Sequence, residues 1–294
     1  MSTATSYVPD WLEKRAQLSP DKVALIDADT KEKFTYARWN KNANQTARYL
    51  KSLGVKKGDR IAVLAANCIE YLDIWFSCNK LGSIMQNLNW RLTSLELKGI
   101  ITDASPNILI YSSDFAGIVA GIQKDIRCVE QWIALGKKAT ATDESFSAKS
   151  NFPTTSLPKV EIDQDDPWVI CYTGGTTGLP KGALLTFRAI NANAVNTVMS
   201  WELDCNDIAI LNAPLFHTGG LNVFTAPLIQ AGGTSIVCKG FSVDQTFDLI
   251  NNWNVTLFFG VPTMFISMQQ HKDWSNVDFS RCKLVINGGA PAPA

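Results

Sequence analysis

Stretches with apolar residues at helical spacing alternate with short apolar runs along most of the chain. A helix is predicted over 35–53, where apolar side chains recur every three or four positions and Gly54 supplies a C-terminal stop. Further helices are predicted over 68–81, from the capping box Thr93-Ser94-Leu95-Glu96, after Arg188 and from about Gly220. Short apolar runs predict strands at 60–65, 83–87, 107–111, 131–135, 168–172, 183–187, 208–212, 234–238, 256–259 and 283–287.

Strands that alternate with helices of this length require crossover connections, and these favour parallel pairing. The fold expected is therefore α/β, with two doubly wound, mainly parallel sheets flanked by helices. Between 136 and 166 the sequence becomes polar and loses its periodicity, which is typical of an exposed connection. We therefore expect two lobes, 1–150 and 151–294, and the second lobe begins shortly before a glycine-rich segment.

Charge and composition exclude several classes of protein. The 27 basic and 27 acidic residues cancel, so no basic field is present to attract nucleic acid or an anionic membrane. The N-terminus lacks the pattern of a secretory signal, and no apolar run reaches the length of a membrane helix, so we expect a soluble, cytoplasmic protein. The seven cysteines form no CxxC pair, which favours reduced, mostly buried thiols over disulfides or a zinc site.

The segment from Tyr172 to Gly182 carries the strongest chemical signal. It contains four glycines, three threonines and one lysine in eleven residues, directly after an apolar strand. Glycines let backbone N–H groups approach phosphate oxygens, threonine hydroxyls add donors, and lysine adds a positive charge. A glycine-rich turn without function would not need the lysine and the threonines. A Walker A loop requires Gly-Lys-Ser/Thr at its end, and Pro180-Lys181-Gly182 does not supply it.

This segment resembles the signature loop of the adenylate-forming superfamily, which includes acyl-CoA synthetases, luciferases and the adenylation domains of peptide synthetases. The family loop most often has serine where this chain has Gly174. Three other segments resemble family motifs in the expected order, so the resemblance covers nearly the whole chain. They are Lys80-Leu81-Gly82 with Asn87-Leu88-Asn89-Trp90-Arg91-Leu92-Thr93 and Glu96-Leu97, then Pro214-Leu215-Phe216-His217-Thr218-Gly219-Gly220-Leu221-Asn222, and Asn287-Gly288-Gly289-Ala290-Pro291.

The resemblance implies roles for individual residues. Lys181 and Thr173 are the expected catalytic residues, and Thr173 or Thr176 is expected to face Mg²⁺. The substrate acid is expected at His217, Thr218 and Gly219, with His217 positioning the acid, because a carboxylate is already ionised and needs no general base. The nucleotide-binding residues expected are Thr173, Gly174, Gly175, Thr176, Thr177, Gly178 and Lys181 for phosphate, and Gly288, Gly289, Ala290 and Pro291 for adenine.

Other residues receive structural interpretations. His271 lies in a polar segment and is interpreted as solvated. Several apolar residues could wall an acyl tunnel, but for most of them a place in the core is favoured. These are Phe216, Leu221, Val223, Phe224, Phe258, Phe259 and Met264.

The reaction that the resemblance implies uses ATP, Mg²⁺ and coenzyme A. A small carboxylic acid attacks ATP to give an acyl-adenylate and pyrophosphate, and coenzyme A then displaces AMP. The chain ends within a family motif, and the later residues and C-terminal lid domain of the family are not in it, so we expect an N-terminal portion that is inactive or nearly so in full turnover. The choice of acid and association into homo-oligomers stay open.

Two other functions are consistent with the residues. A non-catalytic nucleotide- or acyl-binding module on the same scaffold predicts binding without pyrophosphate release. A P-loop phosphotransferase or ATPase predicts phosphate release, and the absent Gly-Lys-Ser/Thr sequence disfavours it.

Overall fold

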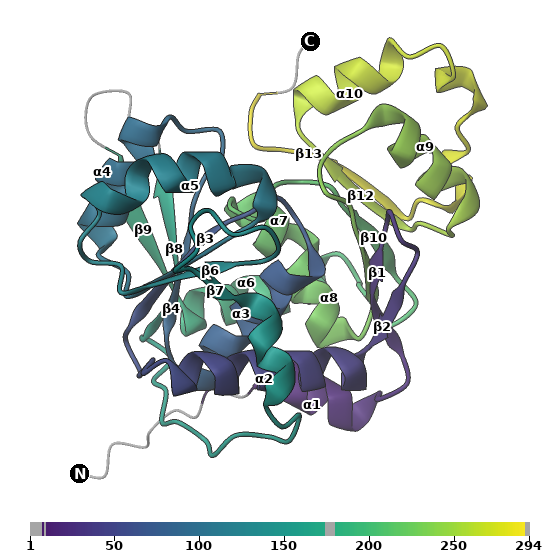
Figure 1. Cartoon of the computed structure of the whole chain (residues 1–294). Helices are drawn as coiled ribbons and strands as arrows, with labels where there is room; N and C mark the ends of the chain where they lie inside the picture. The colour runs from purple at the N-terminus through teal and green to yellow at the C-terminus, as the bar shows by residue number, and fades with distance from the viewer. Residues whose placement is uncertain (1–7, 9, 174–179, 292–294) are drawn as a thin grey trace. The chain divides into compact units, whose positions relative to one another are not determined.

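The computed structural model describes residue 8 and residues 10–173 and 180–291, and they form two units (Figure 1). The first unit comprises Met1–Lys14, Arg38–Ala66 and Glu70–Asn191, and the second comprises Arg15–Ala37, Asn67–Ile69 and Ala192–Ala294. Four helices contain a boundary between the units, namely α1 (Trp11–Leu18), α2 (Tyr36–Ser52), α3 (Ile69–Leu81), whose first residue belongs to the second unit, and α6 (Phe187–Ser200).

The first unit is built on a seven-stranded sheet. Its strands are β3 (Arg60–Leu64), β4 (Ile84–Asn87), β5 (Ile108–Tyr111), β6 (Gln131–Ala134), β7 (Glu144–Ser145), β8 (Pro167–Thr173) and β9 (Lys181–Thr186), in the spatial order β7-β6-β5-β3-β4-β8-β9. Only β8 and β9 pair antiparallel. The long helices are α2, α3 (Ile69–Leu81), α4 (Ser94–Ala104) and α5 (Ala116–Ile122), and 3₁₀ turns lie at Ser113–Phe115, Gln123–Asp125 and Phe146–Asn151.

Two cores hold the first sheet between its helices. Apolar residues of α4 and α5 pack on one face of β3, β5 and β6. Tryptophan dominates the other core, where the Trp168 ring on β8 stacks 4.8 Å from Trp75 of α3 and 4.9 Å from Phe187. The Trp168 indole N–H donates to the Trp75 carbonyl, so the buried polar atom is satisfied. Figure 1 shows α4 and α5 on one side of this sheet and α2 and α3 on the other.

The second unit is built on a six-stranded sheet. Its strands are β1 (Val23–Asp27), β2 (Lys33–Thr35), β10 (Ile208–Leu211), β11 (Thr234–Val237), β12 (Leu257–Gly260) and β13 (Leu284–Asn287), in the order β13-β12-β10-β11-β1-β2. Only β1 and β2 pair antiparallel. Its other elements are α7 (Thr218–Gly220), a π-helical turn (Leu221–Thr225), α8 (Ala226–Ala231), α9 (Val243–Asn252), α10 (Pro262–Gln269) and 3₁₀ turns at Trp274–Asn276 and Phe279–Arg281.

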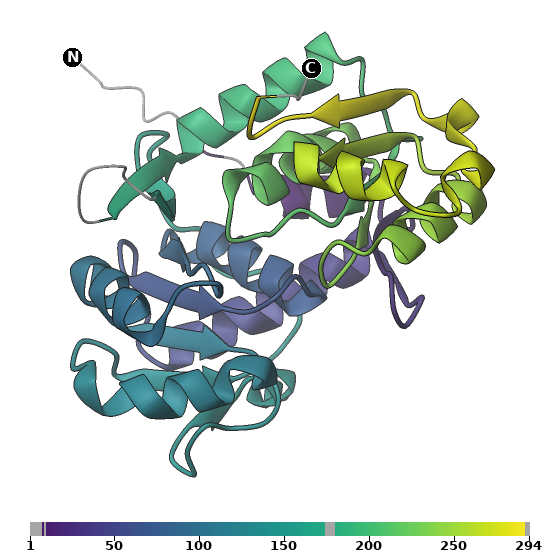
Figure 2. The same cartoon turned by 90° about the horizontal axis from the view of Figure 1, so that it is seen from above.

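Alternate residues of β12 face opposite cores of the second unit. Phe258 packs in the cluster that includes residues of α9 and α10, and these two helices lie side by side (Figure 2). Phe259 packs in the cluster on the other face, with Phe224 and Leu228. Phe258 is fully buried and Phe259 is 8% exposed, so both belong to the core as the sequence favoured.

The α/β class with mainly parallel sheets is confirmed, but the boundary between the lobes lies elsewhere. Residues up to Asn191 belong to the first unit, because β8 pairs with β4 and β9 pairs with β8. In this part of the chain the boundary lies after Asn191 and not near residue 150, as the sequence had suggested. The sequence also missed β1 and β2, which are short and join a sheet whose next strand, β11, begins at Thr234.

The cysteine prediction is confirmed in its main point, since all seven thiols are free. Cys78, Cys171 and Cys238 are buried, whereas Cys205 is exposed. Burial raises the pKa of Cys78 and of Cys238 to about 12, so neither thiol reacts readily at neutral pH. Within the described residues, no helix is long and apolar enough to cross a bilayer.

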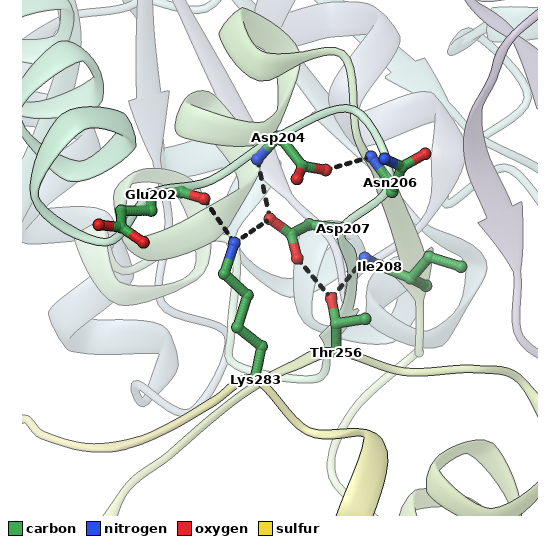
Figure 3. A network of polar contacts seen from close by, with 7 residues as sticks. All are labelled: Glu202, Asp204, Asn206, Asp207, Ile208, Thr256 and Lys283. Carbon is green, nitrogen blue, oxygen red and sulfur yellow. Dashed lines mark hydrogen bonds and ion pairs between the residues drawn. The ribbon is translucent and has the colours of Figure 1, made fainter.

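A buried carboxylate joins the amino ends of three neighbouring strands in the second unit (Figure 3). Asp207 precedes β10, Thr256 precedes β12 and Lys283 precedes β13. The Asp207 carboxylate accepts hydrogen bonds from the Thr256 hydroxyl at 2.8 Å, from the Asp204 N–H at 2.8 Å and from the Lys283 ammonium at 3.2 Å. The Thr256 hydroxyl oxygen accepts from the Ile208 N–H at 3.0 Å, so the network sets the start of the sheet.

Asp207→Ala is expected to lower the free energy of unfolding by about 3 kcal/mol, because it removes the one buried acceptor that the Thr256 hydroxyl, the Asp204 N–H and the Lys283 ammonium share. Urea denaturation measures this loss. Asp165→Ala is the control, because it removes an exposed ion pair with Arg188 and is expected to cost much less stability. Equal losses in the two variants would show that the Asp207 network does not hold the sheet.

Candidate functional site

The carboxyl ends of β10, β12 and β13 are neighbours in the second sheet, because the strand order there is β13-β12-β10. Ligands of doubly wound α/β folds bind at this edge of the sheet. Residues 213–220 follow β10 and residues 288–291 follow β13, so the structure brings the two predicted binding segments of this unit to the same edge.

The ring of Phe259, near the end of β12, lies between these two segments. A Cβ added to Gly219 would lie 3.3 Å from Phe259 Cε1, and one added to Gly288 would lie 3.2 Å from Cε2. A Cβ at either position would be crowded by the ring, so the absence of a side chain lets both backbones approach it closely. Gly289 adopts a left-handed conformation, with φ +84°, and the Gly288 N–H donates to the Gly260 carbonyl. Ala290 is exposed, and the described residues end at Pro291.

The turn that carries His217 is tightly closed on itself. The His217 N–H donates to the Pro214 carbonyl at 3.1 Å, and a Cβ on Gly220 would lie 2.4 Å from that carbonyl oxygen. The Thr225 hydroxyl donates to the Gly220 carbonyl at 2.7 Å across the π-helical turn. Such π-helical turns occur often at functional sites.

Gly220→Ala is expected to lower the free energy of unfolding by about 3 kcal/mol or to prevent folding, because the added methyl group meets backbone that cannot move aside. Gly99→Ala is the matched control, since Gly99 lies inside α4 with nothing within 4 Å of the added Cβ. The control is expected to stabilise the protein by about 0.5–1 kcal/mol. Thermal unfolding of both variants measures the difference, and a Gly220→Ala melting point at the wild-type value would contradict the packing described here.

His217 and Thr218 present their side chains to the outside, whereas the residues around them are largely buried. The side-chain amide of Asn222 donates to the Thr218 hydroxyl oxygen at 2.9 Å. The backbone carbonyl of Asn222 accepts from the side-chain amide of Asn193 at 2.7 Å. Because the Thr218 oxygen accepts this bond, its proton remains available to donate to a ligand. The His217 ring lies 5.4 Å from the Phe216 ring, which is buried.

The predicted phosphate loop lies in the first unit, on the hairpin of β8 and β9. Thr173 and Lys181 face each other in the antiparallel register, and the Thr173 hydroxyl donates to the Lys181 carbonyl at 3.5 Å. Both side chains are exposed at the end of the hairpin. The predicted residues Gly174, Gly175, Thr176, Thr177 and Gly178 lie outside the described residues.

Tyr172 braces this hairpin and was not singled out from the sequence. Its hydroxyl donates to Asp103 Oδ2 of α4 at 2.5 Å, and its ring contacts the backbone of Gly182 across the hairpin. A Cβ on Gly182 would lie 3.2 Å from the ring and 3.0 Å from Ile170, so glycine suits this position. Burial, together with the Asp103 carboxylate, raises the pKa of Tyr172, which keeps the hydroxyl protonated.

The structure corrects the interpretation of His271 as a solvated residue. His271 Nδ1 accepts from the Asp273 N–H at 3.3 Å, and Nε2 lies 3.2 Å from Asp244 Oδ1 at the start of α9. The side chain is only 22% exposed and its ring meets Phe247 edge-on. Both ring nitrogens are engaged, so His271 joins α9 to the segment after α10. Asp244, His271 and Asp273 have metal-binding atoms within 4.8 Å of one another, but Asp244 is 83% exposed.

The predicted site residues thus divide between the two units. Thr173 and Lys181 lie in the first unit, and His217, Thr218, Gly219, Gly288, Gly289, Ala290 and Pro291 lie in the second. Within each unit the structure brings predicted residues from separate segments together: Thr173 with Lys181 in one, and Gly219 of the predicted acid site with Gly288 of the predicted adenine site, around Phe259, in the other.

Comparison with known sequences identifies the family. The family model described as AMP-binding enzyme matches residues 12–294. A feruloyl-CoA synthase from an Amycolatopsis species is 32% identical over 284 residues, which cover 97% of this chain and 54% of that protein. The long-chain-fatty-acid–CoA ligase FadD13 of Mycobacterium tuberculosis is 30% identical over 287 residues, which cover 96% of this chain and 55% of that protein.

Comparison with solved structures gives the same result. The inhibitor-bound N-terminal domain of FACL13 from Mycobacterium tuberculosis superposes with a TM-score of 0.88 at 29% identity, over 96% of this chain and 70% of that one. The anthranilate CoA ligase AuaEII in complex with anthranoyl-AMP gives a TM-score of 0.90 at 26% identity, over 97% of this chain and 55% of that one. The chain spans about half the length of the curated relatives it matches.

Proposed function

Because the chain belongs to the family of AMP-binding enzymes, we propose that it carries the ATP- and acid-binding residues of a carboxylate–CoA ligase. The observation that carries the proposal is the hairpin of β8 and β9, which faces Thr173 with Lys181 on either side of a glycine- and threonine-rich segment. A hydroxyl and an ammonium group at the two ends of such a segment suit a polyphosphate.

The proposed reaction has two steps. The substrate carboxylate attacks the α-phosphorus of ATP, the bond to the pyrophosphate oxygen breaks, and an acyl-adenylate forms. The thiol of coenzyme A then attacks the acyl carbon, and AMP leaves. The protein's part in such chemistry is mainly to position the reactants and to stabilise charge. Lys181 and the hydroxyl of Thr173 are proposed to bind the β- and γ-phosphates, with Gly174, Gly175, Thr176, Thr177 and Gly178 completing the loop.

Mg²⁺ is proposed to bind with the ATP phosphates, where it neutralises their charge. The Thr173 hydroxyl fits such an ion, because its side chain is exposed at the end of β8 and Mg²⁺ prefers oxygen ligands. Thr176 is the alternative ligand. In the second unit, the Gly288 and Gly289 turn is proposed to meet the adenine, and His217, Thr218 and Gly219 are proposed to bind the acid.

The substrate acid is proposed to be an aromatic acid or a fatty acid. Relatives named for ferulate, indoleacetate and long-chain fatty acids are similarly distant from this chain, at 30–32% identity. Seven free thiols are consistent with the reducing cytoplasm, which we propose as the location.

The chain spans about half the length of these relatives, so the binding of ATP by residues 1–294 and their ability to complete the reaction are tested separately. We propose that the 294-residue chain binds ATP but does not complete the reaction by itself. ATP binding by this chain, measured by isothermal titration calorimetry with and without Mg²⁺, tests the first part.

Acid-dependent exchange of ³²P-pyrophosphate into ATP tests the reaction. The panel contains ferulate, indoleacetate, benzoate, laurate and palmitate, and it is applied to the 294-residue chain and to a chimera that continues this chain with the remaining half of FadD13. Exchange by the chimera alone supports both proposals. Exchange by the 294-residue chain would show that its own residues suffice. ATP or acyl binding without exchange by either protein would instead favour a non-catalytic binding module, and phosphate release would favour a phosphotransferase.

A further inference from the structure

Asn67 lies in the connection between β3 and α3, far in sequence from any of the predicted site residues. The short segment Asn67–Ile69 is nevertheless grouped with the second unit. The Asn67 side chain is buried, at 6% exposure, and a buried amide has to find partners for both its oxygen and its nitrogen.

All of these partners are backbone groups on either side of Pro214. Asn67 Oδ1 accepts from the Leu215 N–H at 2.8 Å, and Asn67 Nδ2 donates to the Ala213 carbonyl at 2.9 Å. Nδ2 also lies 3.5 Å from the Leu211 carbonyl, at the end of β10. Because the oxygen faces an N–H and the nitrogen faces carbonyls, only one orientation of the amide satisfies this set.

These bonds connect directly to the turn that carries His217. Asn67 fixes the backbone before and after Pro214, and the Pro214 carbonyl accepts the His217 N–H at 3.1 Å. That same carbonyl is the group against which Gly220 is packed. Rotation of the Pro214 peptide would therefore disturb both ends of the turn. Pro214 has no N–H of its own to resist such a rotation, so the hold has to come from its neighbours.

We propose that Asn67 is a positioning residue for the acid-binding turn formed by His217, Thr218 and Gly219, a role that rests on the proposed function. Asn67 does not touch the substrate. It holds the Pro214 peptide so that the exposed side chains of His217 and Thr218 face the acid in a fixed geometry. The expected consequence is a selective loss of acyl binding when Asn67 is changed, with ATP phosphate binding retained.

A matched control separates positioning from general stability. Asn44 is equally buried, at 2% exposure, and its Nδ2 donates to the Thr154 carbonyl at 2.9 Å within the first unit. Asn67→Ala removes all three bonds. Asn67→Asp is the conservative variant, because it keeps an oxygen for the Leu215 N–H and places a second oxygen against the Ala213 carbonyl. Asn67→Asp keeps the proposal testable where Asn67→Ala does not fold.

The first readout does not depend on function. Amide hydrogen exchange of the peptide containing residues 213–221 is measured by mass spectrometry on the 294-residue chain. Loss of these hydrogen bonds, all three in Asn67→Ala and the two to carbonyls in Asn67→Asp, is expected to accelerate exchange in this peptide by about tenfold. In Asn44→Ala, exchange of this peptide is expected to stay at the wild-type rate.

The second readout tests the role in binding. The probes are feruloyl-sulfamoyl-adenosine and lauroyl-sulfamoyl-adenosine, two unreactive analogues of acyl-adenylates, together with Mg-ATP. The Asn67 variants are expected to lose about tenfold in affinity for the analogue that the wild-type chain binds, with affinity for Mg-ATP within about twofold. Asn44→Ala is expected to change neither affinity by more than about twofold.

Each outcome decides the proposal. Faster exchange with a selective loss of analogue binding supports it. Equal losses for the analogue and Mg-ATP, or unchanged analogue binding, overturn the role of Asn67 and leave the proposed function standing. A wild-type chain that binds neither the analogues nor Mg-ATP overturns the proposed function, and the positioning role with it.

Discussion

Lys181→Met is expected to lower the kcat/KM of acid-dependent ATP–pyrophosphate exchange by about 100-fold or more in the chimera, the largest functional effect of any single change. The estimate follows from the loss that removal of one preorganised charge-stabilising donor causes in other enzymes. Lys181 is the only cation in the segment from Tyr172 to Gly182. Methionine keeps the length of the side chain and removes the charge. The affinity of the 294-residue chain for Mg-ATP is expected to fall at least about tenfold.

Lys98→Met is the control for this loss. Lys98 belongs to the same unit and pairs with Asp125 on the surface, at 2.8 Å. Exchange and ATP affinity are expected to stay within about twofold of wild type in this variant. If Lys181→Met exchanges as fast as Lys98→Met, the phosphate-binding role proposed for the hairpin is wrong.

The sequence predicted most of the fold because the hydrophobic periodicity of most individual helices and strands is clear. The Thr93 capping box is confirmed, because the Thr93 N–H donates to the Glu96 carboxylate. Gly54 follows the end of α2 with φ +94°. Both signals are local, because they depend on residues within one helical turn. The displaced lobe boundary has the opposite origin. The polar segment predicted as a connection contains β7 and a 3₁₀ turn, and only strand pairing decides to which sheet β8 and β9 belong.

The candidate site was predictable where a motif concentrates unusual residues, and not where one residue acts from a distance. The Tyr172–Gly182 segment is conspicuous by composition. Asn67 and Asp103 are not, because each is a single polar residue whose partners lie 144–148 and 69 positions away. His271 shows the same limit: Asp273 is near in sequence, but Asp244 reaches the imidazole only through the packing of α9 against α10. Long-range partners of single polar side chains have no sequence signal.

Lys149→Met is expected to cause the largest loss of stability that depends on pH. In the first unit, Lys149 Nζ lies 2.7 Å from Asp73 Oδ2, and the Asp73 side chain is 1% exposed. Burial raises the pKa of Asp73 to about 6, although the Lys149 ammonium opposes this shift. Without Lys149 the pKa of Asp73 rises further, because burial then acts without the largest charge that opposes it.

The sign of the pH dependence follows from linkage. Folded Asp73 holds its proton more tightly than the unfolded residue, so its contribution to stability is fully present below about pH 4 and is lost as the pH rises through the folded pKa. At pH 5 the wild-type carboxyl is mostly protonated, and Lys149→Met is expected to cost only about 1 kcal/mol. At pH 8 the folded variant has to hold Asp73 either ionised without Lys149 or protonated far above its unfolded pKa, and the expected cost is about 3–5 kcal/mol.

Urea denaturation of wild type and variant at pH 5 and pH 8 measures this difference, and the double variant Asp73→Asn with Lys149→Met identifies its origin. The double variant carries no charge at the buried Asp73–Lys149 pair, so it is expected to recover most of the stability lost at pH 8 and to show little change between the two pH values. Lys98→Met serves again as the control, because its exposed pair is expected to contribute less than about 1 kcal/mol at either pH. A Lys149→Met loss that is equal at pH 5 and pH 8 would mean that Lys149 stabilises the protein through packing on the Phe146 ring, 4.6 Å from Nζ, and not through the charge of Asp73.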